Sequence, residues 1–381
     1  MNNTDVDYMT HAINLATKGL YTTHPNPRVG CVLVKAGTII AEGWHQRAGH
    51  PHAEQIALKA VNNHAQGATA YITLEPCCHY GRTPPCSKAL IAAGITRAVI
   101  AMQDPNPQVA GKGIAQLKEA GIQVDLGILE HKAQALNPGF NKRMTYGLPW
   151  VCCKMAMSLD GRTAPATKER QWITSSAARH DVQLLRARSA AIMTGIGTVL
   201  ADDPALTVRI QATELPGLEP NMPLPNPLRV ILDSRLRTPT KAKILQDSGR
   251  TLIICGTNAD PQKIAALTAA GATIKQLPET STGQIAIESA LRWLAKQEIN
   301  EVLLESGSIL AGAVLEAGLV DEMIIYMAPH IMGDNAIGLF HLSNINNSKQ
   351  RIALEISEIQ PIGTDWRIRA QPVYINRETK P

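Results

Sequence analysis

Three short motifs in the first quarter of the chain combine residue types that bind zinc. The motifs are H-A-E at 52–54, E-P-C at 75–77 and P-P-C at 84–86. Zinc prefers imidazole nitrogen and thiolate sulfur in a tetrahedral arrangement, and a catalytic site leaves the fourth position to water. His52, Cys77 and Cys86 supply that number of ligands. Since helices are expected to begin near His52 and Cys86, the positive end of a helix dipole would favour the Cys86 thiolate.

Glu54 lies two residues after His52 and suits the role of a proton shuttle. Zinc lowers the pKa of a bound water to about 7 and makes it nucleophilic at neutral pH. A neighbouring glutamate would take the water proton, deliver it to a ring nitrogen and protonate the departing ammonia. The ordered pattern of H-x-E and two later cysteines is typical of zinc nucleobase deaminases, in which the glutamate is not a ligand.

The spacing of the two cysteines departs from that pattern. Cys86 follows Cys77 by nine positions instead of three. A closed structural zinc site is an alternative, with Cys78 or His79 as fourth ligand. His79 and Arg82 lie on the inserted loop. They are either solvated residues or contacts for an anionic group of the substrate, because arginine presents forked donors to phosphate.

Length and composition limit the classes of protein to which the chain can belong. The 381 residues predict two domains, and 45% hydrophobic with 18% charged residues is ordinary globular composition. The net charge of +5 permits an anionic ligand, but the positive charges form no dense block and aromatic residues are only 4%. Recognition of single-stranded nucleic acid usually needs stacking aromatics and basic grooves. The composition therefore favours a small-molecule substrate and no nucleic-acid partner.

Seven cysteines, with two adjacent pairs, suit no disulfide framework. The N-terminal residues have no long apolar core, and no run is long enough to span a membrane. We therefore expect a reduced, cytoplasmic protein with no membrane partner.

Strand and helix patterns alternate around the zinc motifs and predict an α/β layered sheet. Thr4 would cap a first helix, with Asp7 three residues later. The further expected elements are strands at 29–34, 38–42, 68–74, 97–102 and 123–126 and helices at 52–61, 87–93 and 114–120.

The Pro-, Gly- and Asn-containing stretch at 137–149 breaks this pattern, and we place the domain boundary there, between domains 1–146 and 147–381. A second alternating series follows. It comprises strands at 151–156, 190–194, 229–233, 251–255, 301–305 and 322–328, helices at 176–188, 261–270, 285–296 and 308–317, and a Pro-rich surface loop at 216–227.

The second domain lacks G-x-G-x-x-G after its first strand, so a standard dinucleotide-binding site is poorly supported. Two glycine-containing strand-to-helix turns, at 194–204 and 305–313, are candidates instead. Each places backbone N–H groups and a helix N-terminus at the end of a strand, where a pyrophosphate binds. Such turns also serve simple chain reversal, so each alone is a weak indication.

Lys154 lies in an apolar strand and is costly to bury without a partner. Asp202 and Glu305, at the ends of strand-like elements, are candidate partners in a cluster that transfers protons during hydride transfer. Basic residues for a second phosphate are available at Arg170, Arg186 and Arg209. The helical position of Arg186 on its own is more typical of a solvated surface charge.

These motifs together resemble the RibD family of bifunctional riboflavin-biosynthesis deaminase–reductases, over nearly the whole chain. The matching segments are THPNPRVGCV, PHAE, TLEPCCHYGRTPPC, AMQDPNPQVAGKG, SLDGRTA, QWITS and TGIGTVLADDPALTVR. The long cysteine spacing is itself typical of the family. The resemblance implies a cytidine-deaminase-like, three-layer α/β/α zinc-dependent domain over 1–146 and a dihydrofolate-reductase-like α/β domain using NADPH over 147–381.

The resemblance also implies the reactions. The first domain would deaminate 2,5-diamino-6-ribosylamino-4(3H)-pyrimidinone 5′-phosphate, and the second would reduce the ribosyl group to ribityl. We also expect a homo-oligomer, either a dimer or a tetramer.

Site residues follow from the same resemblance. In the deaminase these are the acid/base Glu54, the ligands His52, Cys77 and Cys86, the pyrimidine contacts Asn26 and His45, and the phosphate contacts His79 and Arg82. In the reductase the NADPH contacts are Ala156, Trp172, Thr198, Asp202, Ser234, Gly307, Ser308, Ile309, Leu310, Ala311, Gly312 and Ala313. The substrate contacts there are Arg170, Arg186, Leu206, Arg209 and Glu305, with Lys154 assisting reduction at the sugar C1′. Family members often have Ser or Gly near position 170 and sometimes Gly at 156, where this chain has Arg and Ala.

Two rival functions share the zinc motif. One is a nucleic-acid (tRNA) base deaminase with an accessory domain, and the other is a zinc-stabilised binding module without catalysis.

Overall fold

A computed structural model describes residues 3–79, 84–167, 172–218, 222–247, 249–345 and 350–374. The chain divides into two compact units. The first comprises Met1–Gly147 with Ala212–Pro223, and the second comprises Leu148–Gln211 with Leu224–Pro381. The segment at 212–223 therefore interrupts the second unit in sequence, an arrangement that the break at 137–149 does not reveal.

The first unit is built on a five-stranded sheet in the order β2–β1–β3–β4–β5. Its strands are β1 (Gly30–Lys35), β2 (Thr38–Trp44), β3 (Thr69–Ile72), β4 (Arg97–Ile100) and β5 (Gln123–Leu126). Strand β1 is antiparallel to β2 and β3, while β3, β4 and β5 run parallel. The E-P-C motif at 75–77 follows the carboxyl end of the parallel strand β3.

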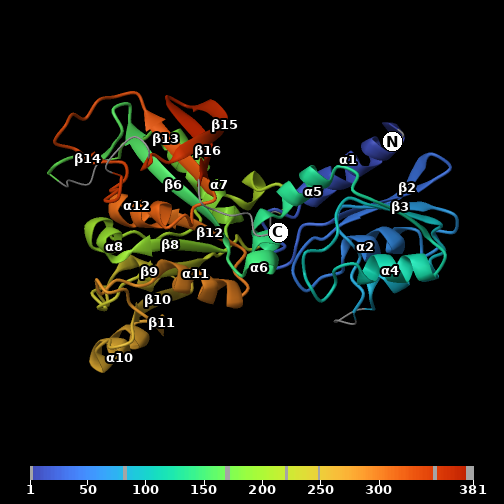
Figure 1. Cartoon of the computed structure of the whole chain (residues 1–381), viewed down its shortest axis with the longest axis horizontal. Coiled ribbons are helices and arrows are strands. Elements are labelled where there is room, and N and C mark those ends of the chain that lie inside the picture. Colours follow the sequence, from blue (N-terminus) through green and yellow to red (C-terminus); the bar gives the residue numbers. More distant parts are fainter. Residues whose placement is uncertain are drawn as a thin grey trace. The chain divides into compact units, whose positions relative to one another are not determined.

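Helices cover both faces of this sheet (Figure 1). They are α1 (Asn3–Thr17), α2 (Ala53–Ala60), α3 (Cys86–Ala92), α4 (Lys112–Glu119), α5 (Glu130–Leu136) and α6 (Pro138–Tyr146), with a 3-10 turn η1 (Ala212–Glu214). Met9 and Ala133, from α1 and α5, pack on one face. Leu58, Leu90 and Leu117, from α2, α3 and α4, pack on the other. The expected three-layer α/β/α arrangement is confirmed.

The second unit contains a nine-stranded sheet in the order β11–β10–β9–β8–β12–β6–β13–β16–β15. Its strands are β6 (Trp150–Ser158), β8 (Ala191–Gly195), β9 (Leu228–Leu232), β10 (Thr251–Gly256), β11 (Ala272–Leu277), β12 (Glu301–Glu305), β13 (Glu322–Ala328), β15 (Ala353–Ile362) and β16 (Asp365–Val373). The strands from β11 to β13 are parallel, and β16 and β15 add an antiparallel hairpin. Strands β7 (Arg162–Ala164) and β14 (Ile337–Gly338) form a separate pair.

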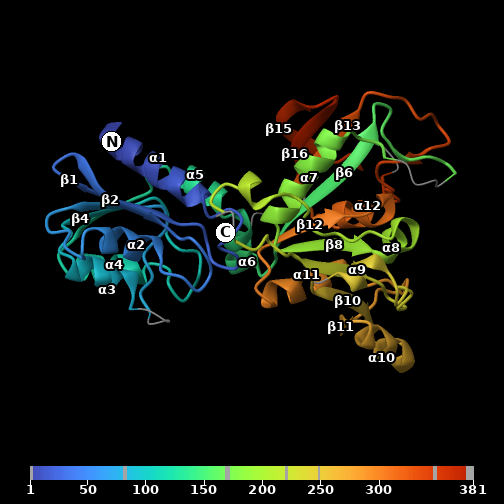
Figure 2. The same cartoon turned by 180° about the vertical axis from the view of Figure 1, so that it is seen from behind.

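Helices of the second unit also lie on both faces of its sheet. They are α7 (Ser176–Arg188), α8 (Ile196–Asp202), α9 (Lys243–Gln246), α10 (Pro261–Ala269), α11 (Ile287–Lys296) and α12 (Ser308–Glu316). Val182 and Leu185 of α7 share a core with Ile192 and Ile324. Leu291 of α11 and Val314 of α12 belong to the core on the opposite face. Figures 1 and 2 show α10 beside β11 at one end of this sheet and the β15–β16 hairpin at the other. The expected α/β class is confirmed.

The predicted break at 137–149 is wrong in part, because α6 fills most of it. Pro138 occupies the first turn of α6, where its fixed φ suits a helix and its missing N–H is not needed. Gly147 ends α6 in the left-handed region with φ of 65°. The residues that suggested a loop are therefore the two ends of a helix. Likewise, α1 begins at Asn3, so Thr4 lies inside its first turn and is not the cap.

Sequence patterns missed α5, β11 and the hairpin β15–β16. Strand β15 alternates apolar and charged residues, but most of its side chains are exposed and Pro361 lies near its end. Nothing in such a segment distinguishes a sheet edge from a polar loop.

No helix in the described part of the chain is long and apolar enough to cross a membrane. All seven cysteines are free. A cytoplasmic location stays a prediction.

A buried ionic cluster anchors α1 to the first sheet. Both carboxylate oxygens of Asp5 accept hydrogen bonds from Arg97, at 2.9 and 3.0 Å, and Tyr71 Oη donates to Oδ1 at 2.6 Å. Arg97 also donates to Asp125 at 2.7 Å. The hydrogen bonds from Arg97 hold the pKa of Asp5 below its ordinary value, with burial opposing them.

We predict that Asp5→Asn lowers the free energy of unfolding of the first unit by about 2 kcal/mol at pH 7, since hydrogen bonds to charged groups are worth that order. The contribution is fully present above the ordinary carboxyl pKa of about 3.9 and is lost as the pH falls toward the lowered pKa of the folded state. Calorimetry of the full chain at pH 7 and pH 3 measures both effects. Glu288→Gln, which removes an exposed pair with Arg292, is the matched control. Equal unfolding temperatures for wild type and Asp5→Asn at pH 7 would contradict the prediction.

Candidate active sites

The structure brings the three predicted zinc ligands together. The donor atoms of His52, Cys77 and Cys86 lie within 4.8 Å of one another. His52 Nδ1 lies 3.6 Å from Cys77 Sγ and 3.3 Å from Cys86 Sγ. Three converging donors of imidazole and thiolate type match a tetrahedral site with one open position.

Local structure explains why these ligands meet. His52 is the N-cap of α2, and Cys86 is the first residue of α3. The Gln55 side chain accepts from the His52 N–H at 3.4 Å and donates to the Pro84 carbonyl at 3.2 Å, so it connects the starts of both helices. The Cys86 N–H also donates to Cys77 Sγ at 3.3 Å. A hydrogen bond from the Cys86 side chain, the contact with His52 and the Cys86 N–H lower the pKa of Cys77 to about 4 against the effect of burial, which favours a thiolate there.

The Glu54 side chain lies beside the cluster of metal donors and is shielded from solvent. Its residue is 3% exposed, and its Oε2 has no hydrogen-bond partner. Burial raises its pKa, while His52 acts against that effect. A buried carboxylate oxygen without a partner is costly unless a group absent from the protein alone completes it. A water held at the open metal position would do so, and the cluster therefore fits zinc.

The turn that carries Cys77 is held by a residue to which the sequence analysis gave no role. Buried Glu75 accepts four backbone N–H groups, from Asp104, Gly111, Gly113 and Ile114, at 2.9–3.1 Å. These groups belong to the start of α4 and the loop before it. At Gly113 a Cβ would lie 2.0 Å from the Pro76 carbonyl oxygen, so only glycine permits this contact. The E of E-P-C was visible in sequence, but its partners lie far along the chain.

Two further predicted deaminase residues lie next to the metal cluster. His45 Nε2 is 3.1 Å from Asn26 Nδ2, its Nδ1 is 3.1 Å from the Pro51 carbonyl, and its ring lies edge-on to that of His52 at 5.5 Å. His79 is exposed on the inserted loop. Arg82 lies outside the described residues.

The closed-site alternative finds no support in the positions of its fourth ligands. Cys78 Sγ faces the Gln108 carbonyl at 3.9 Å. Within the described ranges, the metal-ligand cluster contains neither Cys78 nor His79.

In the second unit, Lys154 of β6, Glu305 of β12 and Arg186 of α7 form a buried charged cluster. Adjacent parallel strands place Glu305 directly opposite Lys154, with Nζ 3.8 Å from Oε2. Arg186 donates Nε and Nη2 to the two oxygens of Glu305 at 2.6 and 2.9 Å. Arg186 is 8% exposed, so its interpretation as a solvated surface charge is wrong. The need of Glu305 for a partner outweighs the helical pattern.

The charged groups of this cluster shift one another's pKa values. Burial lowers the pKa of Lys154, Arg186 acts in the same direction, and Glu305 opposes them. Burial acts to raise the pKa of Glu305, but Arg186 and Lys154 hold it below its ordinary value. A lysine with a lowered pKa beside a fixed carboxylate suits proton transfer. Ion pairs in the described part of the chain join Lys154 to Glu305 and do not include Asp202, so the role of Asp202 stays a prediction.

The two glycine-containing turns lie side by side at the carboxyl ends of β8 and β12. These strands are parallel neighbours, and each leads directly into a helix, α8 or α12. The Gly307 N–H donates to Thr198 Oγ1 at 3.2 Å, and a Cβ at Gly195 would lie 3.3 Å from Leu310. This edge of a parallel sheet is where phosphate-containing cofactors bind.

The predicted NADPH contacts differ in how open they are. Gly307, Ser308, Ile309 and Ala313 are partly or fully exposed, as is Trp172, which is 65% exposed. Ala311 is buried in the core, and a Cβ at Gly312 would meet the His341 carbonyl oxygen at 2.0 Å, so both positions are tightly packed and their role as cofactor contacts stays a prediction.

The remaining positions follow the sheet. Ala156 lies on β6 two residues beyond Lys154, Asp202 ends α8, and Ser234 follows β9.

The loop after α8 is joined to α7 by hydrogen bonds. Arg186 Nη1 donates to the Thr207 carbonyl at 3.0 Å, and the Arg209 N–H donates to Gln183 Oε1 at 2.8 Å. Leu206 is buried with φ of 52°, and Arg209 is exposed. Arg170 lies outside the described residues.

Comparison with known proteins covers both units. Residues 149–368 match the family described as RibD C-terminal domain, and residues 2–102 match the cytidine and deoxycytidylate deaminase zinc-binding region. The riboflavin biosynthesis protein RibD of Escherichia coli K12 is 48% identical over 95% of this chain and 97% of its own length. That of Bacillus amyloliquefaciens is 41% identical over 97% of this chain and 99% of its own length.

Solved structures agree with the sequence matches. Acinetobacter baumannii RibD has a TM-score of 0.88 at 44% identity, covering 98% of this chain and 99% of that chain. A diaminohydroxyphosphoribosylaminopyrimidine deaminase/5-amino-6-(5-phosphoribosylamino)uracil reductase from Thermotoga maritima has a TM-score of 0.83 at 30% identity, covering 97% of this chain and 99% of that chain. With these relatives matching from one end of the chain to the other, and with a three-ligand metal cluster in one unit and a lysine–carboxylate cluster in the other, the chain belongs to the RibD family of riboflavin biosynthesis proteins.

Proposed function

We propose the residues by which this chain, a bifunctional deaminase and reductase of riboflavin biosynthesis, carries out its two reactions. The observation that supports the deaminase assignment best is the unpartnered, buried oxygen of Glu54 beside three converging metal donors. For the reductase it is the largely buried Lys154–Glu305–Arg186 cluster at the carboxyl end of β12.

In the deaminase site, His52, Cys77 and Cys86 hold zinc, which when bound makes a water nucleophilic at neutral pH. Glu54 would take a proton from the attacking water and deliver it to the ring nitrogen. It would then take the second proton, from the hydroxyl group added to the ring carbon, and deliver it to the amino group, which departs as ammonia. Asn26 and His45 bind the pyrimidine, and His79 and Arg82 bind the phosphate. The substrate is 2,5-diamino-6-ribosylamino-4(3H)-pyrimidinone 5′-phosphate, in keeping with the activity named for the Thermotoga maritima relative.

In the reductase site, Lys154 delivers the proton that accompanies reduction at the ribosyl C1′, while Glu305 fixes its position. NADPH, when bound, supplies the hydride. Exposed groups of the two turns, together with Ala156, Trp172, Thr198, Asp202 and Ser234, bind the cofactor. Arg186, Leu206, Arg209, Glu305 and Arg170 bind the substrate.

The two rivals are not favoured. A nucleic-acid deaminase with an unrelated accessory domain does not account for the match of residues 149–368 to the RibD reductase family. A binding module without catalysis gives the buried Glu54 no use.

We predict that Glu54→Gln lowers ammonia release by at least about 100-fold, because a positioned acid/base contributes 10²–10⁴. Zinc content, measured by mass spectrometry of the metal, stays near one per chain since Glu54 is not a ligand. NADPH oxidation with the deaminated substrate is unchanged. Glu119→Gln, an exposed residue of α4, is the control. Normal deamination by Glu54→Gln, or loss of its zinc, would sink the assignment.

For the reductase we predict that Lys154→Met lowers NADPH oxidation by about 100-fold or more while ammonia release stays normal. NADPH affinity, followed by fluorescence titration, changes only a few-fold because the lysine acts on the sugar. Lys296→Met removes an exposed lysine of α11 and should change nothing. Turnover of Lys154→Met at the wild-type rate contradicts the proposed role, and turnover of the wild type with NADH alone contradicts the cofactor assignment.

We also propose that the chain is a homo-oligomer joined along β15. Within the described residues this ten-residue strand pairs with β16 alone, so its outer edge is free. Leu354, Ile356 and Ile359 on it are exposed. A long edge strand with exposed apolar side chains favours pairing with another chain, and an antiparallel strand can pair with its own copy about a two-fold axis.

Placing charges on this edge tests the oligomer. Ile356→Lys with Ile359→Lys should convert the wild-type oligomer to monomers in sedimentation velocity. Leu126→Lys, at the exposed edge strand of the first unit, is the matched control and keeps the wild-type state. A wild type that sediments as a monomer, or an unchanged double variant, would refute the proposal.

A further inference from the structure

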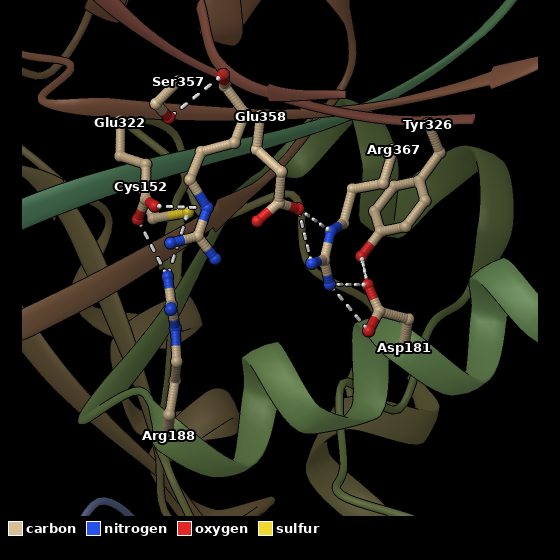
Figure 3. Close-up of polar contacts among 9 residues, drawn as sticks. Cys152, Asp181, Arg188, Glu322, Tyr326, Ser357, Glu358 and Arg367 are labelled. Carbon is tan, nitrogen blue, oxygen red and sulfur yellow. Dashed lines mark hydrogen bonds and ion pairs between the residues drawn. The ribbon is translucent and has the colours of Figure 1, made fainter. Parts of the chain in front are cut away.

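One face of α7 is tied to the C-terminal hairpin by charged groups. Asp181 accepts two hydrogen bonds from Arg367 Nη1 of β16, at 3.0 and 2.9 Å, and one from Tyr326 Oη of β13 at 2.5 Å. Arg367 in turn donates to Glu358 of β15 at 2.7 Å. Figure 3 shows this chain of contacts running from the helix to both strands of the hairpin.

A second tie lies near the end of the helix. Arg188 Nη2 donates to Glu322 of β13 at 2.8 Å, and Arg369 Nε of β16 lies 3.4 Å from the other oxygen of Glu322 (Figure 3 labels Arg188 and Glu322). Glu322 and Asp181 are both largely buried. Two carboxylates and three arginines thus join α7, β13 and β16 on this side.

Helix geometry links this face to the reductase cluster. Asp181 and Arg188 are seven residues apart, so they project from nearly the same side of α7. Arg186 lies five residues after Asp181, about 140° around the helix. From there it reaches Glu305 and the Thr207 carbonyl. A rotation or sliding of α7 that breaks the ties on one side therefore withdraws Arg186 from Glu305 on the other.

The charged contacts between α7 and the strands β13 and β16 are better suited to fixing the position of α7 than to holding it on the sheet. Apolar contacts tolerate small sliding, whereas a bidentate or hydrogen-bonded charge pair has a narrow geometry. Buried ion pairs contribute little net stability, and their best-attested use is to fix register. Apolar residues of α7, such as Val182 and Leu185, already hold it to the sheet.

We propose that Asp181 is a positioning residue of the reductase site, through which the β15–β16 hairpin holds α7 in the register that aims Arg186 at Glu305. This inference rests on the proposed roles of Arg186, Glu305 and Lys154. It assigns a function to a hairpin that contributes no group to the reaction.

A double-mutant cycle tests it. Asp181→Asn should lower kcat/KM of the reductase for the deaminated pyrimidine by about tenfold, within the range of coupling seen between interacting residues. In an Arg186→Ala background the same change should cost less than about twofold, because the residue through which it acts is gone. An effect of equal size in both backgrounds overturns the proposal. If Arg186→Ala alone leaves the reductase unaffected, the proposed function of the cluster fails instead.

A second readout separates positioning from simple loss of stability. Lys154 faces Glu305 of β12 and Arg186 of α7, and Arg186 acts to lower the pKa of Lys154. Looser placement of Arg186 in Asp181→Asn should raise that pKa. Competitive labelling of Lys154 with acetic anhydride across pH, read by mass spectrometry, measures it in the folded protein. An unchanged Lys154 titration counts against the proposal.

Controls and a milder variant complete the test. Glu288→Gln removes a carboxylate–arginine pair of α11 and should leave both readouts unchanged. Ammonia release by the first unit should be normal in every variant. Should Asp181→Asn not fold, Tyr326→Phe removes one hydrogen bond to Asp181 without changing shape, and a smaller loss of kcat/KM that again vanishes with Arg186→Ala is expected. A loss that persists in that background refutes the inference.

Discussion

A carboxylate taken out of water needs partners, and the buried carboxylates of this chain decide where its reactive groups lie. Glu75 has its charge met by four backbone N–H groups, and so it fixes the turn that carries Cys77. Glu305 pairs with Arg186, and so it holds a second charge, Lys154, opposite the carboxyl end of β12. Glu54 keeps one oxygen without a partner. Glu75 and Glu305 fix the positions of other groups because protein donors satisfy them, whereas Glu54 has an oxygen free for proton transfer.

The difference between Glu54 and Glu75 shows why residue type does not determine role. Both are in short motifs beside a predicted zinc ligand, and both are buried. Glu75 faces the start of α4, where unpaired N–H groups are concentrated. Glu54 lies on the second position of α2, where its carboxylate is close to His52 and Cys77. A proton shuttle needs an oxygen that no protein donor occupies, and of these two glutamates Glu54 provides it.

Local patterns in the sequence predicted most of what is local in the structure. The strands β5, β12 and β13 and the helix α7 have the bounds that periodicity indicated. The three predicted zinc ligands, whose donor atoms converge, could be named because they lie in short motifs in a characteristic order. Arg186 could not be placed, since a helical arginine is usually solvated and its partner Glu305 is 119 residues away. Glu75 was equally hidden, because its partners are backbone groups of a later loop. Segments such as β15 and α6 were missed where exposure or capping residues imitate a loop.

Helix α7 must both pack against the sheet and keep one rotation about its axis, and apolar contacts alone provide only the first. Its inward residues supply adhesion, but adhesion alone would allow several rotations of nearly equal energy. The charged contacts of Asp181 and Arg188, on nearly the same side of α7, restrict that freedom because they pair with Arg367, Tyr326 and Glu322 of the sheet. In that orientation Arg186 lies beside Glu305 and also holds the loop at Thr207. The burial of charge, costly in itself, thus selects one arrangement from many, and the site depends on that selection more than on the strength of any one contact.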